Sequence, residues 1–529
     1  MGLFTVDGKP FFPLGGQSNN SSAYNEKELK SAVDGILAVG GNTLEAPVYW
    51  EQIEPSEDEF DFTSVDEMFR SCEQADIKLI ILWFATWKNG EMRYVPEWVK
   101  KDALRFERAV SYFNSPMNVL SSHCEENLKA DAKAFTKLIE HISKLDPKLE
   151  TIIAVQVENE PGILGSDKDY GKRALDYYSG QVPVGLIEFI KGRAEGDAYK
   201  IWKESGAQSS GTWSEIFGIH GPEMGEAFSI ARYINAVAKE GKKILSVPMS
   251  VNVWMGEHGW HIPGFYPAGG AVRRTIDIWK YATPDIDVIA PDIYLGNFTD
   301  YKKACETYTR DDNPLYIPES GANDQNALNM IRAIADFGCE GYFAFAIDSV
   351  LGPDGNLRPS ARNFTYSLQA TKNIAPLLLK YRGTGRIHSL VQEPYQQMKS
   401  FEFENFICAA LFAGQGGLFV GKDHRYQQDP SLTEGLPHFG YIIEASPDEF
   451  YLSGHMHIYF APKKSPDWNH VNKGVSPSYT PFDYLSVEEG VLDEQGNFSA
   501  TRKRNGDEVV FGSFWASPQC GVVRVRLNI

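Results

Sequence analysis

The chain has 529 residues, of which 43% are hydrophobic and 23% are charged, and its net charge is −19 at pH 7. This composition excludes disordered and fibrous proteins, and the length allows one large domain of about 250 to 350 residues beside a smaller one. The negative charge argues against nucleic-acid and membrane partners, because both anionic surfaces attract clusters of Lys and Arg.

The cysteines and the N-terminal residues indicate the cellular compartment in which the protein is expected. The six cysteines are scattered without a C-x-x-C spacing, so we expect reduced, buried thiols rather than disulfides or a zinc site. The sequence MGLFTVDGKPFF lacks the basic and apolar regions of a signal peptide, and no apolar window of roughly 18 residues occurs. We therefore expect a cytoplasmic protein, although a removed export signal would leave no trace here.

Short apolar runs alternate with segments of helical periodicity over the first 350 residues, which is typical of an α/β fold. No G-x-G-x-x-G sequence opens a helix, which disfavours a dinucleotide-binding sheet. Eight runs with intervening helices indicate a (β/α)₈ barrel, or TIM barrel, rather than an open sheet. The expected strands are residues 11–17, 42–48, 78–84, 151–158, 244–251, 287–294, 314–319 and 341–347.

Beyond residue 350 the pattern changes to strand-like runs divided by Gly, Pro, Asn and Asp clusters. Such spacing is typical of an all-β domain, and a sandwich is the arrangement we expect. We predict a catalytic barrel over residues 1–375 and a C-terminal β-rich domain over residues 376–529. The expected strands here include 400–413, 439–445, 450–461 and 520–529.

Two glutamates each follow a buried apolar run. Glu160 lies in VQVENEPG, where Pro161 ends the strand pattern, and Glu319 lies in PLYIPESG directly after Pro318. Both carboxylates are therefore expected at the C-terminal mouth of the barrel, where barrel enzymes carry their chemistry. Glycoside hydrolysis needs two such groups, since one protonates the leaving oxygen and the other stabilises or attacks the sugar cation. A salt-bridged loop carboxylate is the alternative interpretation of each.

Glu158 precedes Glu160 by two residues. Strand alternation would place both side chains on one face, so Glu158 is expected to be a buried partner that adjusts the pKa of Glu160.

Several segments resemble glycoside hydrolase family 35, the β-galactosidases, within the clan of retaining (β/α)₈ glycosidases. QVENEPG (156–162) is close to that family's fourth-strand motif, with Pro161 where an aromatic residue is usual. GGNTLEAPVYWEQIEPSEDEFDF (40–62) matches its second-strand region, and PLYIPE (314–319) is similar to its nucleophile strand. In contrast, ILWFATWKNG (81–90) resembles the family 42 β-galactosidases, and GYFAFAIDS lacks the usual eighth-strand motif. The resemblance therefore implies a divergent branch.

The resemblance implies a retaining double displacement with Glu319 as nucleophile and Glu160 as acid/base. A retaining pair stands about 5 to 5.5 Å apart, whereas a separation near 8 Å would indicate inversion. Asn159 is the expected hydrogen-bond partner of the sugar 2-hydroxyl, and Tyr294 is expected to orient Glu319. The implied activity is that of an exo-β-glycosidase, most closely a β-galactosidase.

Other side chains at predicted strand ends are candidates for recognising the sugar. A carboxylate such as Glu45 can accept two sugar hydroxyls, and aromatic rings can pack on the C–H faces of a sugar. His258 and His261 lack a third ligand at suitable spacing, so we expect no metal and no cofactor. The substrate-binding candidates are Gln17, Glu45, Trp83, Trp254 and Glu257.

Three functions stay open at this point. The first is a β-galactosidase, and the second is another glycosidase of the clan, such as a β-glucosidase or β-xylosidase. The third is a non-catalytic carbohydrate-binding barrel, which the presence of both carboxylates disfavours. The expected partner is an oligosaccharide or glycoside, and the sequence leaves association into a homo-oligomer open.

Overall fold

The computed structural model describes residues 2–256, 262–412, 436–463, 484–506, 508–509 and 513–528. The chain forms two compact units, one of residues 1–321 with 340–354 and one of residues 322–339 with 355–529. The expected domain boundary at 375/376 lies inside helix α14 (Arg362–Tyr381), which belongs to the second unit, and this boundary stays a prediction.

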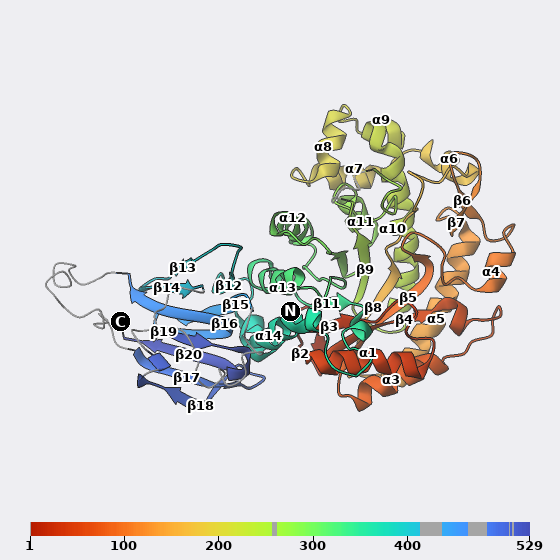
Figure 1. Cartoon of the computed structure of the whole chain (residues 1–529). Coiled ribbons are helices and arrows are strands. Elements are labelled where there is room, and N and C mark those ends of the chain that lie inside the picture. Colours follow the sequence, from red (N-terminus) through yellow and green to blue (C-terminus); the bar gives the residue numbers. More distant parts are fainter. Residues whose placement is uncertain are drawn as a thin grey trace. The chain divides into compact units, whose positions relative to one another are not determined.

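Parallel strands form the centre of the first unit, curled in the order β10-β9-β8-β5-β4-β3-β11 (Figure 1). Their residues are almost entirely buried, as expected for parallel strands covered on both faces. The bounds are β3 (Leu14–Gln17), β4 (Thr43–Tyr49), β5 (Lys78–Lys88), β8 (Ile152–Asn159), β9 (Met249–Trp254), β10 (Val288–Asp292) and β11 (Tyr342–Phe345).

An eighth extended segment, residues 314–320, closes this sheet. Ile293 pairs with Ser320, and Ile317 pairs with Tyr342 as parallel bridges. The Ile293 amide donates to the Glu319 carbonyl (2.9 Å), and the Phe343 amide donates to the Ile317 carbonyl (3.0 Å). The (β/α)₈ barrel predicted from the sequence is therefore confirmed, with its seventh strand joined by isolated bridges rather than a continuous ladder.

Local sequence explains how the barrel elements begin and end. Asn25 caps α1 through its side chain, and Gly40 ends that helix in the left-handed conformation at φ 75°. In β3, a Cβ on Gly15 would lie 1.9 Å from the Thr43 carbonyl oxygen, so β3 and β4 approach closely only because glycine stands there. The fifth strand begins at Met249 instead of the predicted residue 244, because the turn that ends α10 occupies the residues after Lys242.

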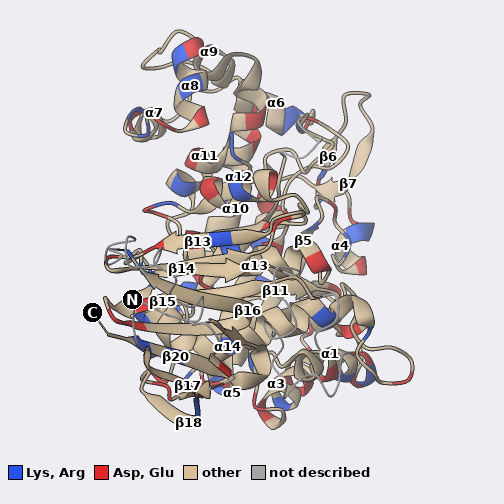
Figure 2. Ribbon diagram, turned by 60° about the vertical axis from the view of Figure 1, so that its left-hand side comes forward, with Lys and Arg blue, Asp and Glu red and all other residues tan. Residues whose placement is uncertain are grey.

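The helices of the first unit flank the strands (Figure 1). On helices such as α1 and α3, Lys and Arg are interspersed with Asp and Glu (Figure 2), as in the Lys30–Asp34 pair at 2.7 Å. The principal helices are α1 (Glu26–Val39), α3 (Thr63–Gln74), α5 (Glu125–Leu145), α10 (Gly221–Lys242), α11 (Ile276–Ala282) and α12 (Phe298–Tyr308). Shorter elements are β1 (Thr5–Val6), β2 (Lys9–Pro10), α2 (Trp50–Ile53), α4 (Glu97–Lys101), β6 (Arg108–Val110) and β7 (Pro116–Leu120).

A helical insertion separates β8 from α10. The first part of this insertion is bound by Glu226 of α10, which accepts hydrogen bonds from the Tyr178 hydroxyl and the Asp169 amide (3.2 Å). Glu226 also accepts a hydrogen bond from Ser122 Oγ (3.1 Å), which precedes α5. Burial opposes the charge on Glu226, but His123 and these donors outweigh it and lower its pKa. The insertion comprises α6 (Lys172–Tyr178), α7 (Val184–Lys191), α8 (Asp197–Glu204) and α9 (Trp213–Phe217).

The second unit is an antiparallel β domain with two helices, α13 (Asp324–Phe337) and α14. The long strand β16 is shared: its first half pairs with β15 and β20, and its second half pairs with β14 and β19. The expected all-β domain is confirmed. Its strands are β12 (Ile387–Val391), β13 (Met398–Glu402), β14 (Phe406–Leu411), β15 (Phe439–Ser446), β16 (Glu449–Pro462), β17 (Tyr484–Leu492), β18 (Phe498–Arg504), β19 (Ser513–Ala516) and β20 (Val522–Leu527).

The core of this β domain is apolar and includes Phe450, Leu452, Met456 and Ile458 of β16. The six cysteines of the chain all lie in the described residues, where they are buried and form no disulfide bond. Within the described ranges, no helix combines the length and apolarity needed to cross a bilayer.

Candidate active site

Three buried carboxyl groups converge at the C-terminal ends of the barrel strands. Glu160 follows β8, Asp292 ends β10, and Glu319 lies on the closing segment. One carboxylate oxygen of each lies within 4.8 Å of the others. The structure thus brings the two predicted glutamates together in one cluster.

The backbone around Asn159 is strained. Glu158 and Glu160 both have positive φ, at 64° and 45°, in a region that side chains other than glycine rarely adopt. Such strain persists only where the surroundings fix the conformation, and it gathers at functional sites.

Glu158 faces different neighbours from Glu160. Its carboxylate accepts hydrogen bonds from the amides of Thr86 (3.2 Å) and Trp87 (2.7 Å), and its charge interacts with Asp131 of α5. The expectation that Glu158 shares a face with Glu160 is wrong, because the positive φ angles interrupt the alternation of the strand.

Hydrogen-bond donors from separate strands surround Glu319. Its Oε1 accepts from Gln17 Nε2 (2.9 Å) and Asn159 Nδ2 (3.3 Å). Its Oε2 accepts from the Tyr294 hydroxyl (2.8 Å), so the predicted contact between Tyr294 and Glu319 is present. A set made of donors suits an ionised carboxylate, which is the form required of a nucleophile.

Asn252, on β9, connects all three carboxyl groups. Its Oδ1 accepts from the Glu160 amide (2.8 Å), while its Nδ2 donates to Asp292 Oδ2 (2.8 Å) and lies 3.4 Å from Glu319 Oε1. The sequence reasoning missed both Asn252 and Asp292. A signal existed for each, since SVNVW places Asn252 between two valines and APDIY places Asp292 within an apolar run.

Two further residues of the site come from the end of β5 and were also missed. Lys88 is 3% exposed, and its Nζ donates to Asn159 Oδ1 (2.7 Å). Asn89 Nδ2 donates to Glu160 Oε2. Both belong to ILWFATWKNG, the segment that departs from the family 35 pattern, so this departure marks residues that contact the candidate catalytic groups.

The carboxyl groups of the cluster differ in their electrostatic environments. Burial and the charge of Glu319 raise the pKa of Glu160 to about 7, and Lys88 partly offsets this effect. Burial also raises the pKa of Asp292 well above its usual range, with further contributions from Glu319 and Glu160. A carboxyl group with a pKa near neutrality can act as a general acid at that pH.

Glu45 and Gln17 lie side by side on neighbouring strands. Glu45 is fully buried, and it accepts a hydrogen bond from the Tyr316 hydroxyl. Burial raises its pKa well above the usual range, Tyr316 opposes this, and Glu319 adds to it. Glu45 Oε2 and Gln17 Oε1 have no hydrogen-bond partner in the structure, so each retains an unused acceptor.

The remaining predicted residues lie elsewhere. Trp83 is fully buried, and its indole donates to Asp131 of α5 (2.9 Å) and packs beside Phe135, so this position gives no support for a contact with sugar. Trp254 ends β9 in register with Asp292 and is partly exposed, and its role stays a prediction. Glu257 lies outside the described residues, as do His258 and His261.

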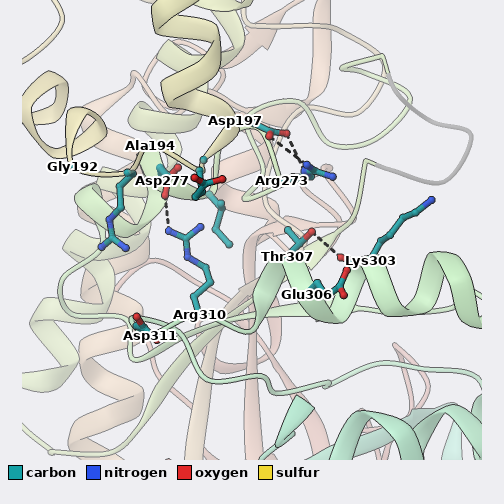
Figure 3. A pocket seen from close by; sticks show the side chains of 14 residues that line it. Gly192, Ala194, Asp197, Arg273, Asp277, Lys303, Glu306, Thr307, Arg310 and Asp311 are labelled. Atoms are coloured by element: carbon teal, nitrogen blue, oxygen red, sulfur yellow. Dashed lines mark hydrogen bonds and ion pairs between the residues drawn. The ribbon is translucent and has the colours of Figure 1, made fainter. Parts of the chain in front are cut away.

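A separate cavity of about 530 Å³ lies against α8, α11 and α12 (Figure 3). Its walls carry paired charges: Arg310 contacts Asp277 at 2.6 Å, and Arg273 contacts Asp197 at 3.0 Å. The lining residues are 192–197, 273, 276–277, 303, 306–307 and 310–311, and they include no member of the carboxyl cluster.

Comparisons with known proteins find a match to one family model in part of the chain and several similar solved structures. Residues 365–515 match a family described as a domain of unknown function, DUF5597. No curated protein matches the sequence.

Among solved structures, the β-amylase catalytic domain of Paenibacillus polymyxa is 12% identical, with a TM-score of 0.49, over 67% of this chain and 97% of that one. A β-galactosidase of Bacillus circulans sp. alkalophilus is 15% identical, with a TM-score of 0.49, over 71% of this chain and 58% of that one. An exo-β-1,4-mannosidase of Opitutaceae bacterium strain TAV5 is 13% identical, with a TM-score of 0.42, over 70% and 61%. This chain thus spans less than two thirds of the last two proteins.

Proposed function

We propose that the protein is a retaining glycoside hydrolase in which Glu319 is the nucleophile and Glu160 is the acid/base. The proposal rests on the different environments of the Glu160 and Glu319 carboxyl groups, which have one oxygen each within 4.8 Å of the other. Glu319 is surrounded by donors that favour a carboxylate, whereas the pKa of Glu160 is raised to about 7. Carboxyl groups whose environments separate their protonation states are suited to acid and nucleophile roles.

In the first step, Glu319 attacks the anomeric carbon while the bond to the leaving oxygen breaks. Glu160 gives its proton to that oxygen, and a glycosyl ester forms on Glu319. We propose that Asn159 binds the sugar 2-hydroxyl, and its contacts support this role, since Lys88 donates to its Oδ1 while its Nδ2 is directed at Glu319. A hydrogen bond to this hydroxyl strengthens in the transition state.

In the second step, Glu160 is a carboxylate and takes a proton from water as the water oxygen attacks the anomeric carbon. The ester bond breaks, Glu319 regains its charge, and the sugar leaves with retained configuration. These steps require no metal or cofactor.

The substrate we propose is a terminal β-galactoside of an oligosaccharide, on the strength of the family 35 resemblance. Glu45 and Gln17 supply unpartnered buried oxygens that suit the hydroxyl groups of a sugar. Lys88 and Asn89 come from a segment unlike that of family 35, so a β-glucoside or β-xyloside is the alternative within the same mechanism.

The test is an assay of purified protein on aryl β-galactoside, glucoside, xyloside, fucoside and arabinoside. We expect cleavage of at least one substrate, and a loss of about 10³-fold or more in Glu319→Gln. Glu97→Gln, on the exposed face of α4, is the matched control and should keep wild-type rates.

Glu160→Gln distinguishes the two roles. It should retain its first step on aryl glycosides with good leaving groups, and azide should restore turnover by replacing water in the second step. A preference for the galactoside would support a β-galactoside as the substrate. A preference for another glycoside would replace the β-galactoside as the proposed substrate. If the wild-type protein cleaves no member of the panel but binds sugars, the chain is a binding barrel and the proposal is wrong.

A further inference from the structure

Asp292 is a buried carboxyl group for which the two-carboxylate mechanism has no use. It is 4% exposed, and Asn252 Nδ2 donates to its Oδ2 at 2.8 Å. Its Oδ1 has no hydrogen-bond partner in the structure, and its carboxyl group interacts with those of Glu319 and Glu160. Two carboxylates cannot hydrogen-bond to each other unless one of them carries a proton.

We propose that Asp292 is a protonated carboxylic acid in the working site, and that it donates a hydrogen bond to Glu160, which it positions and stabilises as a carboxylate. This inference rests on the proposed function, because it assigns Asp292 a place beside the acid/base. Asp292 acts through Glu160 and is therefore a positioning residue.

The charges of the cluster favour this arrangement. Buried charges need compensation, and three carboxyl groups within 4.8 Å cannot all ionise. With Asp292 and Glu160 protonated, the ammonium of Lys88 balances the carboxylate of Glu319 inside the barrel mouth. The ionisable groups that interact with Asp292 and Glu160 are Glu319, Lys88 and Tyr294, and Glu45 interacts in turn with Glu319.

The protons balance through the catalytic cycle. In the first step Glu160 loses its proton to the leaving oxygen, and Glu319 loses its charge by forming the ester. The new carboxylate of Glu160 then accepts the Asp292 hydrogen bond and faces the Lys88 ammonium. In the second step water returns a proton to Glu160, and Asp292 keeps its own proton throughout. The raised pKa of Asp292, caused first by burial and then by Glu319 and Glu160, agrees with this assignment.

Substitutions at position 292 test whether Asp292 is a neutral hydrogen-bond donor or an ionised neighbour of Glu160. Asp292→Asn keeps size and a hydrogen-bond donor, whereas Asp292→Ala removes the donor. We expect Asp292→Ala to lose kcat on the order of 10- to 100-fold, with the greater loss on poor leaving groups that need the acid. Asp292→Asn should keep at least about tenfold more activity than Asp292→Ala. A purely structural role would affect good and poor leaving groups alike.

The pH profile of kcat/KM tests the charge of Asp292 directly. If Asp292 is neutral, Asp292→Asn leaves the alkaline limb of the profile at its wild-type position. If Asp292 is ionised, the substitution removes a negative neighbour of Glu160 and moves that limb down by about one pH unit or more. This shift would overturn the inference. An Asp292→Asn variant that is inactive but restored by azide would also overturn it, because Asp292 would then be the acid/base.

A measurement independent of turnover separates this inference from the proposed function. Difference infrared spectra of wild type and Asp292→Asn at pH 7 should show the loss of a carbonyl band of a protonated carboxylic acid. Absence of that loss would refute a protonated Asp292 even if the protein cleaves glycosides. Conversely, a lost band in a protein that cleaves no glycoside would support the protonation state and refute the hydrolase function.

Discussion

Replacing Glu160 by Gln should stabilise the protein, and the gain should depend on pH in a defined way. Burial and Glu319 raise the pKa of Glu160 from an ordinary value of 4.5 to about 7. Between these two values the folded protein binds the proton and the unfolded chain releases it. The stability that Glu160 contributes is therefore fully present below pH 4.5 and is lost as the pH rises through 7.

The magnitude follows from the two pKa values. Their difference corresponds to about 3 kcal/mol of unfavourable free energy for holding Glu160 ionised in the fold at alkaline pH. Glutamine has a similar shape and stays neutral, so Glu160→Gln avoids this cost. We expect the variant to match wild type near pH 4.5 and to be more stable by about 3 kcal/mol above pH 8.

Urea unfolding of both proteins, followed across pH 4.5 to 8.5, measures the difference. Glu226→Gln is the matched control, because Glu226 is equally buried but has a lowered pKa. Its contribution is present above the unfolded pKa and lost as the pH falls, so Glu226→Gln should destabilise most at neutral pH. A Glu160→Gln difference that is constant with pH, or that favours wild type at pH 8, would refute the reasoning.

Three kinetic predictions accompany it. Tyr294→Phe removes the hydroxyl that donates to Glu319, and kcat/KM on an aryl glycoside should fall about 10- to 100-fold. Lys88→Met removes a cation that lowers the pKa of Glu160, so the alkaline limb of the kcat/KM profile should move upward; a downward shift would contradict the assignment. Asn159→Ala should slow cleavage of an ordinary glycoside but have little effect on a 2-deoxy glycoside, and equal losses on both would remove Asn159 from the 2-hydroxyl.

The barrel could be predicted because each strand is an apolar run buried on both faces. This pattern is local, as in β4 and β8, and it needs no knowledge of distant contacts. Glu160 and Glu319 could be predicted for a related reason, since each ends such a run beside a proline. The start of β9 could not be predicted correctly, because the turn after α10 contains apolar residues whose pattern is typical of a strand.

The rest of the site depends on contacts between distant residues. Asn252 and Asp292 are separated by 40 positions, and their meeting follows only from the pairing of β9 with β10. The orientation of Glu158 follows from its positive φ, and this conformation could not be predicted from the sequence because a glutamate rarely adopts it. Trp83 was expected at the mouth because it ends a predicted strand, but β5 continues to Lys88 and leaves Trp83 in its interior.

The position of Asn252 makes the carboxyl cluster a single cooperative unit. One amide side chain orients the backbone of Glu160, the carboxyl of Asp292 and, more weakly, Glu319. Removing any one of these groups therefore changes the surroundings of the others, so the effects of single substitutions here will not sum to the effect of combined ones. Double-mutant cycles, which measure the coupling free energy between two residues, are therefore needed to describe how these residues contribute to the rate.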